Sequence, residues 1–163
     1  MDIQLLVDTI SRITHVSTAI ALVGGTVFVL FVLIPSTVAM PEADERRLRV
    51  AVNQRWKRFV YVGIALFLVS GFYNFIRAIP SHHGDGLYHA LIGTKILLAF
   101  AMFFIASALV GRSKAFDSMR KNRVLWLKVI VLLAFSVVAI SGFAKIRGTP
   151  FKTEITDPNN TPK

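Results

Sequence analysis

The sequence predicts an all-α, polytopic membrane protein, a four-transmembrane-helix bundle made of two similar helical hairpins. The first observation is composition: 54% of the 163 residues are hydrophobic, more than a soluble domain of this length normally carries. The second is that four apolar segments are each long enough to cross a bilayer. There is no cysteine, which excludes disulfides, iron–sulfur clusters and thiolate metal sites.

The four expected spans cover residues 13–38, 59–76, 87–110 and 124–144. The first contains no Lys, Arg, Asp or Glu, the third is interrupted only by Lys95, and the fourth carries Lys128 near one end. Runs of β-branched residues could suggest strands, but their length without alternation favours helices. The second helix is expected to begin before its span, because Pro41 is followed by three acidic residues within one turn.

Both ends of the chain differ from the membrane domain, which we place at residues 13–148. Residues 1–12 form a leader with apolar residues at helical spacing. It either lies along the membrane surface as an amphipathic helix or extends the first span. A signal peptide is disfavoured, because the apolar run that follows is too long. Residues 149–163 form a polar, Pro-containing tail that we expect to be flexible.

Basic residues predict the orientation in the membrane. Two loops hold six cations each. These are Arg46, Arg47, Arg49, Arg55, Lys57 and Arg58 in the first loop, and Arg112, Lys114, Arg120, Lys121, Arg123 and Lys128 in the third. The positive-inside rule then places both loops in the cytoplasm of a bacterium, with both termini outside its inner membrane. The net charge of +10 is therefore an orientation signal, and nucleic acid is not an expected partner.

A short repeat predicts the two hairpins. "LVSGFYNFIRA" (68–78) and "AISGFAKIRG" (139–148) both place Ser-Gly-Phe before an Ile-Arg pair. His15 and His89 also recur, each near the outer start of an odd-numbered span. A parallel repeat implies a pseudo-two-fold axis along the membrane normal. The two histidines are then expected to face one another across the bundle, where helical bundles commonly hold cofactors and metals.

Haem b is the first chemistry that this pair suggests. Two neutral imidazoles can ligate the iron axially, so His15 and His89 are the candidate metal ligands. Arg77 is a candidate partner for the propionates. Lys95 lies too deep to reach the membrane surface easily, and could hydrogen-bond helix-end carbonyls or Asn74, or meet a propionate or substrate carboxylate. The alternative is that both histidines sit at the interface without a ligand.

Copper is the second chemistry. The loop pair His82–His83 could join His15 and His89 in a nitrogen-rich site suited to Cu(II). The absence of cysteine and the scattered methionines count against a Cu(I) pathway. A third interpretation involves no cofactor: the chain could be a scaffold subunit of a larger membrane complex.

Several stretches resemble known families. "YHALIGTKILLAFAMFFIASALVGR" and "RWKRFVYVGIALFLVSGFYNFIRA" resemble helices of the copper-resistance D (CopD) membrane domain. "HVSTAIALVGGTVFVLFVLIP", "ERRL" and Lys95 resemble the related HemJ-type protoporphyrinogen oxidases, small four-helix membrane proteins associated with haem b. The resemblance implies His15 and Lys95 as site residues.

Residues and resemblance together favour an integral membrane protein that binds b-type haem near its outer face. The expected role of such a protein is electron transfer or a small HemJ-like oxidoreductase activity. A redox partner or a quinone would then exchange electrons with it. Besides the lipid bilayer, a second copy of the chain or a larger membrane complex is an expected partner. Copper handling of the CopD type is the alternative.

Overall fold

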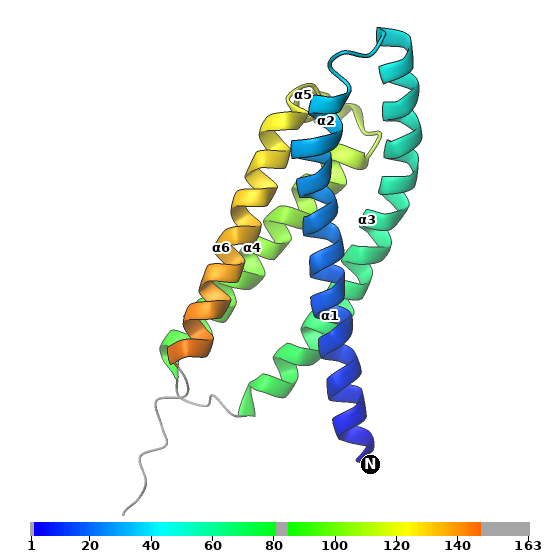
Figure 1. The fold of residues 1–163 in the computed structure, drawn as a ribbon. Coiled ribbons are helices and arrows are strands. Elements are labelled where there is room, and N and C mark those ends of the chain that lie inside the picture. The colour runs from blue at the N-terminus through cyan, green and yellow to red at the C-terminus, as the bar shows by residue number, and fades with distance from the viewer. Residues whose placement is uncertain (1, 81–84, 148–163) are drawn as a thin grey trace, which may run out of the picture.

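The computed structural model describes residues 2–80 and 85–147, and these contain helices but no strand. Four long helices run along the molecule (Figure 1): α1 (Ile3–Phe28), α3 (Glu42–Ala78), α4 (Gly86–Val110) and α6 (Arg123–Arg147). Short elements join them: η1 (Val29–Leu33), α2 (Ile34–Ser36), η3 (Lys114–Phe116) and α5 (Asp117–Lys121). Each long helix lies in a segment long and apolar enough to cross a membrane, which confirms the predicted fold class.

The leader and the first span form one continuous helix. Asp2 caps its start by accepting a hydrogen bond from the Gln4 backbone amide at 3.0 Å. Near the other end, η1 is a π-helical turn in which the Ile34 amide bonds to the Val29 carbonyl. Pro35 follows directly, and it has no amide hydrogen and a ring that crowds the carbonyl four residues earlier. The wider π turn accommodates the proline without breaking the helix.

The helices pack as two hairpins. α1 packs mainly on α3, and α4 mainly on α6, while α3–α4 and α1–α6 contacts close the ring. α1 and α4 are therefore diagonal, as the predicted two-fold relation requires. Ser70 and Ser141, the repeated serines, also behave alike: each hydroxyl donates to the carbonyl four residues earlier, at 2.7 and 2.6 Å.

The core lies toward the end of the bundle that carries α2 and α5. Its main buried residues include Leu30, Ile105, Leu109 and Ile130, contributed by η1, α4 and α6. At the opposite end, near the N-terminus, α4 and α6 lie apart from α1 and α3 (Figure 1). The two hairpins are thus joined tightly at one end and diverge at the other.

The outer surface of the bundle is apolar. Ile20, Leu97 and Phe135 are examples, with 68%, 71% and 66% of each side chain's surface exposed. In water such a surface would cause aggregation, whereas in a bilayer it is the expected lipid-facing surface. The exposed apolar surface of the bundle therefore agrees with the hydrophobic composition of the sequence.

Candidate cofactor site between the hairpins

A row of polar side chains joins α1 to α3 in the outer half of the first hairpin. On α1 these residues follow the 4–3–4 spacing that keeps one helix face turned toward a neighbour. We call the set the polar seam: Gln4, Asp8, Ser11 and His15 on α1, and Ser70, Tyr73, Asn74 and Arg77 on α3. Interhelical hydrogen bonds of this kind support helix association in membranes, where the hydrophobic effect between helices is absent.

Asp8 is the centre of the outer part of the seam. The Arg77 guanidinium donates to both of its carboxylate oxygens, from Nε at 3.1 Å and from Nη2 at 3.0 Å. The Tyr73 hydroxyl donates to the same carboxylate at 2.7 Å, and the Gln4 amide at 3.1 Å. A bidentate pair with two further donors fixes both helices in register at this level.

Ser11 and Asn74 occupy the next level inward. The Ser11 hydroxyl lies 3.2 Å from Asn74 Oδ1 and 3.3 Å from the Ser70 carbonyl. Asn74 was one of several candidate partners of Lys95, and the hydrogen bond that its side-chain oxygen accepts comes from Ser11. Arg77, expected near propionates, is instead engaged with Asp8.

His15 ends the seam at its inner end. Its Nδ1 lies 3.2 Å from the hydroxyl oxygen of Ser70, a buried residue on α3. The Ser70 hydroxyl hydrogen is directed at the Leu66 carbonyl, 2.7 Å away, so its oxygen is left to accept from His15. The hydrogen-bond network thus assigns the proton of a neutral His15 to Nδ1. Nε2 then keeps a free lone pair, as in histidines that ligate metals.

The surface of α3 is shaped to hold the His15 ring. The ring packs against Phe67 with their centroids 4.0 Å apart. On the next turn, Gly71 leaves space for it: a Cβ at that position would lie 3.0 Å from His15 Cε1 and 3.3 Å from Nδ1. Glycine and serine therefore allow close approach and a hydrogen bond at the same place, a combination common between membrane helices.

Lys95 reaches the same region from α4. It is half-buried, and its charge influences His15, although their helices are diagonal and no direct contact joins the two side chains. Within residues 2–80 and 85–147, Lys95 has neither an ion pair nor a hydrogen bond from its amine. Two groups that can both carry positive charge thus influence one another, and Lys95 has no neutralising carboxylate among the described residues, which is costly inside a membrane.

Aromatic and small side chains continue from His15 toward the interior. Phe67 meets Phe103 of α4 edge to face at 5.5 Å, and Phe103 meets Phe100 at 6.5 Å. A cavity of about 130 Å³ lies between the hairpins and is lined by Ala19, Phe67 and Phe103 among others.

His89 lies in different surroundings from His15. It is exposed in the first turn of α4, and its ring contacts Tyr88 with centroids 5.8 Å apart. Lys95 is six residues, about 9 Å of helix rise, further in. The contacts of the two histidines, with Ser70 and Phe67 for His15 and with Tyr88 for His89, do not join them to one another. The pair His82–His83 lies outside the described residues, and within them no group of three or more potential metal ligands occurs.

Sequence reasoning missed three residues that contribute to this site, namely Ser70, Gly71 and Asp8. The signal was present on α1: the apolar residues of the leader, such as Ile10 and Ile13, are exposed on the outside of the bundle. The opposite face of the same helix carries the polar seam. The polar positions of α3 follow a matching spacing of three and four residues. Comparing them with the polar face of α1 would have paired the two helices.

Fold and surface define the class: this is a multi-pass, all-α membrane protein with a half-buried histidine and lysine between its two hairpins. Comparison with known proteins gives no relative that would narrow this class. No protein-family model matches the chain, and neither a curated protein nor a solved structure does.

Proposed function

We propose that the chain binds a b-type haem between its two hairpins, with His15 as an axial ligand and Lys95 as a partner of a propionate. The observation that carries the proposal is the setting of the half-buried His15, whose Nδ1 is hydrogen-bonded to Ser70 and whose ring packs on Phe67, with a half-buried Lys95 on the diagonal helix. Haem offers an iron for an imidazole and carboxylates for an ammonium group, so one ligand would satisfy both residues. Bound haem would supply one-electron redox chemistry.

Three local features support His15 as the ligand. Its Nδ1 hydrogen bond to Ser70 leaves Nε2 free and fixes the ring orientation, as second-shell partners do in metal sites. Gly71 provides the space for the ring. Phe67 and Phe103 offer flat apolar surface of the kind that a porphyrin contacts. No contact among the described residues gives similar support to His89.

The remaining parts of the proposal follow from the charge pattern. The protein would lie in the bacterial inner membrane with both termini outside, consistent with the N-terminus and the end of α6 lying at one end of the bundle (Figure 1). Electron transfer or a small oxidoreductase activity is the proposed role, with a protein redox partner or a quinone. No specific observation favours copper handling.

The test is the visible spectrum of the purified chain, expressed with a haem precursor and read with and without dithionite. We expect a Soret band, with α and β bands that sharpen on reduction. His15→Ala should remove most of this absorbance, and Ser70→Ala should weaken haem affinity by about tenfold to a hundredfold. His89→Ala is the matched histidine variant, and we expect it to retain more haem than His15→Ala.

Three outcomes would overturn the proposal. A His15→Ala protein with an unchanged spectrum would remove the proposed ligand. Colourless protein that binds copper stoichiometrically would indicate copper handling instead. Colourless, metal-free protein from haem-supplemented cells would favour the scaffold interpretation.

A further inference from the structure

A second hollow lies at the other end of the bundle, where the charge pattern predicts the cytoplasmic surface. Its volume is about 630 Å³. It is lined by residues of η1 and α2, the first part of α3, the end of α4, α5 and the start of α6. His15, Lys95 and the polar seam do not line it, whereas Asn53, Leu109 and Arg123 line both this hollow and the cavity of about 130 Å³ between the hairpins.

The hollow has an excess of positive charge. Four cations line it, Arg49, Arg120, Lys121 and Arg123, against two carboxylates, Glu45 and Asp117. Both carboxylates already have partners in the structure: Glu45 pairs with Arg49 at 3.6 Å, and Asp117 pairs with Arg120. No carboxylate that lines the hollow is therefore left for Lys121 and Arg123.

Arg120 has a structural role and is not available to a ligand in the same way. Besides Asp117, it donates to the carbonyls of Ala108 and Gly111 at 3.3 Å and to that of Ser113 at 2.6 Å. These bonds hold the loop after α4 against α5. Its guanidinium is thus committed to the fold.

Arg123 is the informative residue. It is partly buried at the start of α6, and within the part of the chain that the structure describes it has neither a hydrogen bond nor an ion pair. Arg49, a second guanidinium group, lines the same hollow and repels Arg123. Arg49 shares the hollow with its partner Glu45, whereas Arg123 has no carboxylate partner in that part of the chain, so positive charge remains in excess there. A phosphate would stabilise this arrangement, because each guanidinium fork matches phosphate oxygens.

The walls distinguish a lipid from a free ion. Leu33, Ile34, Leu109 and Val124 give the hollow an apolar side next to its charged one. Trp126, one turn into α6 from Arg123, is placed as interfacial tryptophans are, so the hollow falls at the level of the headgroups. An amphiphile would use both surfaces, whereas an inorganic phosphate would use only the guanidinium groups.

We propose that this hollow binds the phosphate headgroup of an anionic phospholipid, held by Arg49 and Arg123, with the glycerol and first acyl carbons against the apolar wall. Basic pockets between membrane helices are known to recognise such headgroups. The proposed headgroup site uses neither His15 nor Lys95, although Arg123 also lines the cavity between the hairpins.

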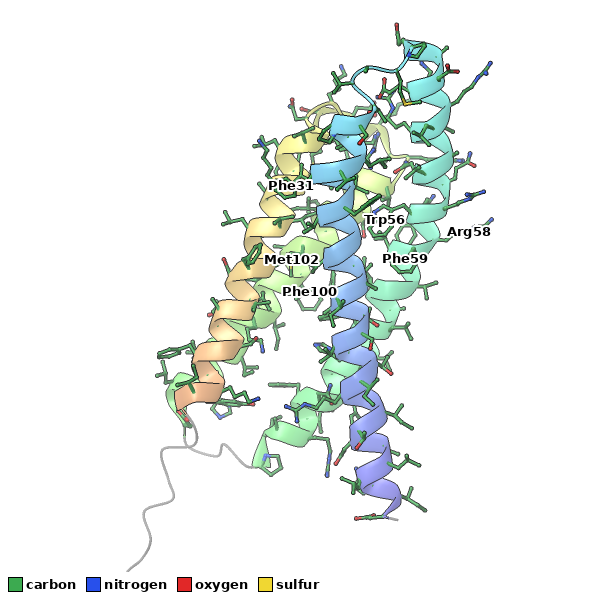
Figure 2. The ribbon with its side chains drawn as sticks, in the orientation of Figure 1. Phe31, Trp56, Arg58, Phe59, Phe100 and Met102 are labelled. Atoms are coloured by element: carbon green, nitrogen blue, oxygen red, sulfur yellow. The ribbon has the colours of Figure 1, made fainter. Side chains whose placement is uncertain are left out.

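The test uses the full chain in a neutral detergent, with thermal unfolding followed while phosphatidylglycerol, phosphatidylcholine or sodium phosphate is titrated. We expect phosphatidylglycerol to raise Tm at lower concentration than phosphatidylcholine. Arg123→Gln should weaken the apparent phosphatidylglycerol affinity by about fivefold, the effect of one interfacial cation. Arg58→Gln is the matched control, since Arg58 is an exposed cation of α3 that points away from the bundle (Figure 2).

Equal stabilisation by the two lipids, or equal effects of Arg123→Gln and Arg58→Gln, would overturn the proposal. If sodium phosphate alone reproduces the shift, the ligand is a free anion and the lipid assignment is wrong. Should Arg123→Gln fail to fold, Arg49→Gln and Arg123→Lys provide the same comparison. The lysine variant keeps the charge but loses the bidentate fork, so its affinity should fall between those of the wild type and Arg123→Gln.

Discussion

The contact between Gly25 of α1 and Trp56 of α3 gives the sharpest test of how the first hairpin is packed. A Cβ at Gly25 would lie 2.2 Å from Trp56 Cη2 and 2.7 Å from Cζ3. Non-bonded carbon atoms prefer separations of about 3.5–4.0 Å. The Trp56 ring is also stacked on Phe59 with centroids 5.3 Å apart, which restricts its retreat. Figure 2 shows Trp56 between α1 and α3. Gly25→Ala should therefore destabilise the fold.

The neighbouring residue supplies a matched control. A Cβ at Gly24 would meet nothing within 4 Å, so Gly24→Ala adds the same methyl group without a clash. Both substitutions gain helix propensity, about 0.5–1 kcal/mol relative to glycine, and this contribution cancels when the two variants are compared. What remains is the overpacking cost, typically about 1–3 kcal/mol. We expect Gly25→Ala to be less stable than Gly24→Ala by that amount.

The measurement is unfolding in mixed micelles with a rising fraction of denaturing detergent, followed by circular dichroism and tryptophan fluorescence. The chain has two tryptophans, so the fluorescence change includes a direct signal from Trp56. A double-mutant cycle with Trp56→Ala checks the cause, because Gly25→Ala should cost much less once the ring is absent. Equal stability of the two alanine variants, or an undiminished penalty in the Trp56→Ala background, would refute the proposed packing.

Two further predictions concern the polar seam. Gly71→Ala should displace the His15 ring by a few tenths of an ångström and lower haem retention, measured from the Soret band, whereas Gly93→Ala, with nothing within 4 Å of its Cβ, should leave retention unchanged. Asp8→Asn should lower Tm slightly, and combining it with Arg77→Gln should add little, because both variants remove one partner of the same ion pair. Fully additive effects would contradict that pairing, and equal haem loss in the two glycine variants would contradict the contact at Gly71.

The sequence alone was sufficient for the helices. Length and apolarity located all four spans, and the acidic turn after Pro41 located the start of α3, which begins at Glu42. The third span was expected at residues 87–110 and α4 is Gly86–Val110. These features depend on local composition and capping, which a single sequence contains in full.

The contacts between helices were less predictable. α4 is apolar on all sides, so its sequence has no periodic pattern to indicate which face meets a neighbour. The repeat correctly implied that α1 and α4 are diagonal, but no described contact joins the pair His15–His89 that it suggested. The depth of His15 depends on how far α1 extends outward, and the sequence left open whether the leader was part of that helix.

The distribution of hydroxyl groups explains why the hairpins can diverge near the proposed haem site. In the first hairpin, Ser11 bonds across to α3. In the second hairpin, the hydroxyls of Thr94, Ser136 and Ser141 bond back to carbonyls of their own helices. These hydroxyl groups therefore have hydrogen-bond partners, as polar groups in lipid require. None of these hydrogen bonds joins one hairpin to the other. Separation of the hairpins at this end leaves all of these bonds intact, so a flat apolar ligand entering there would mainly exchange one set of apolar contacts for another.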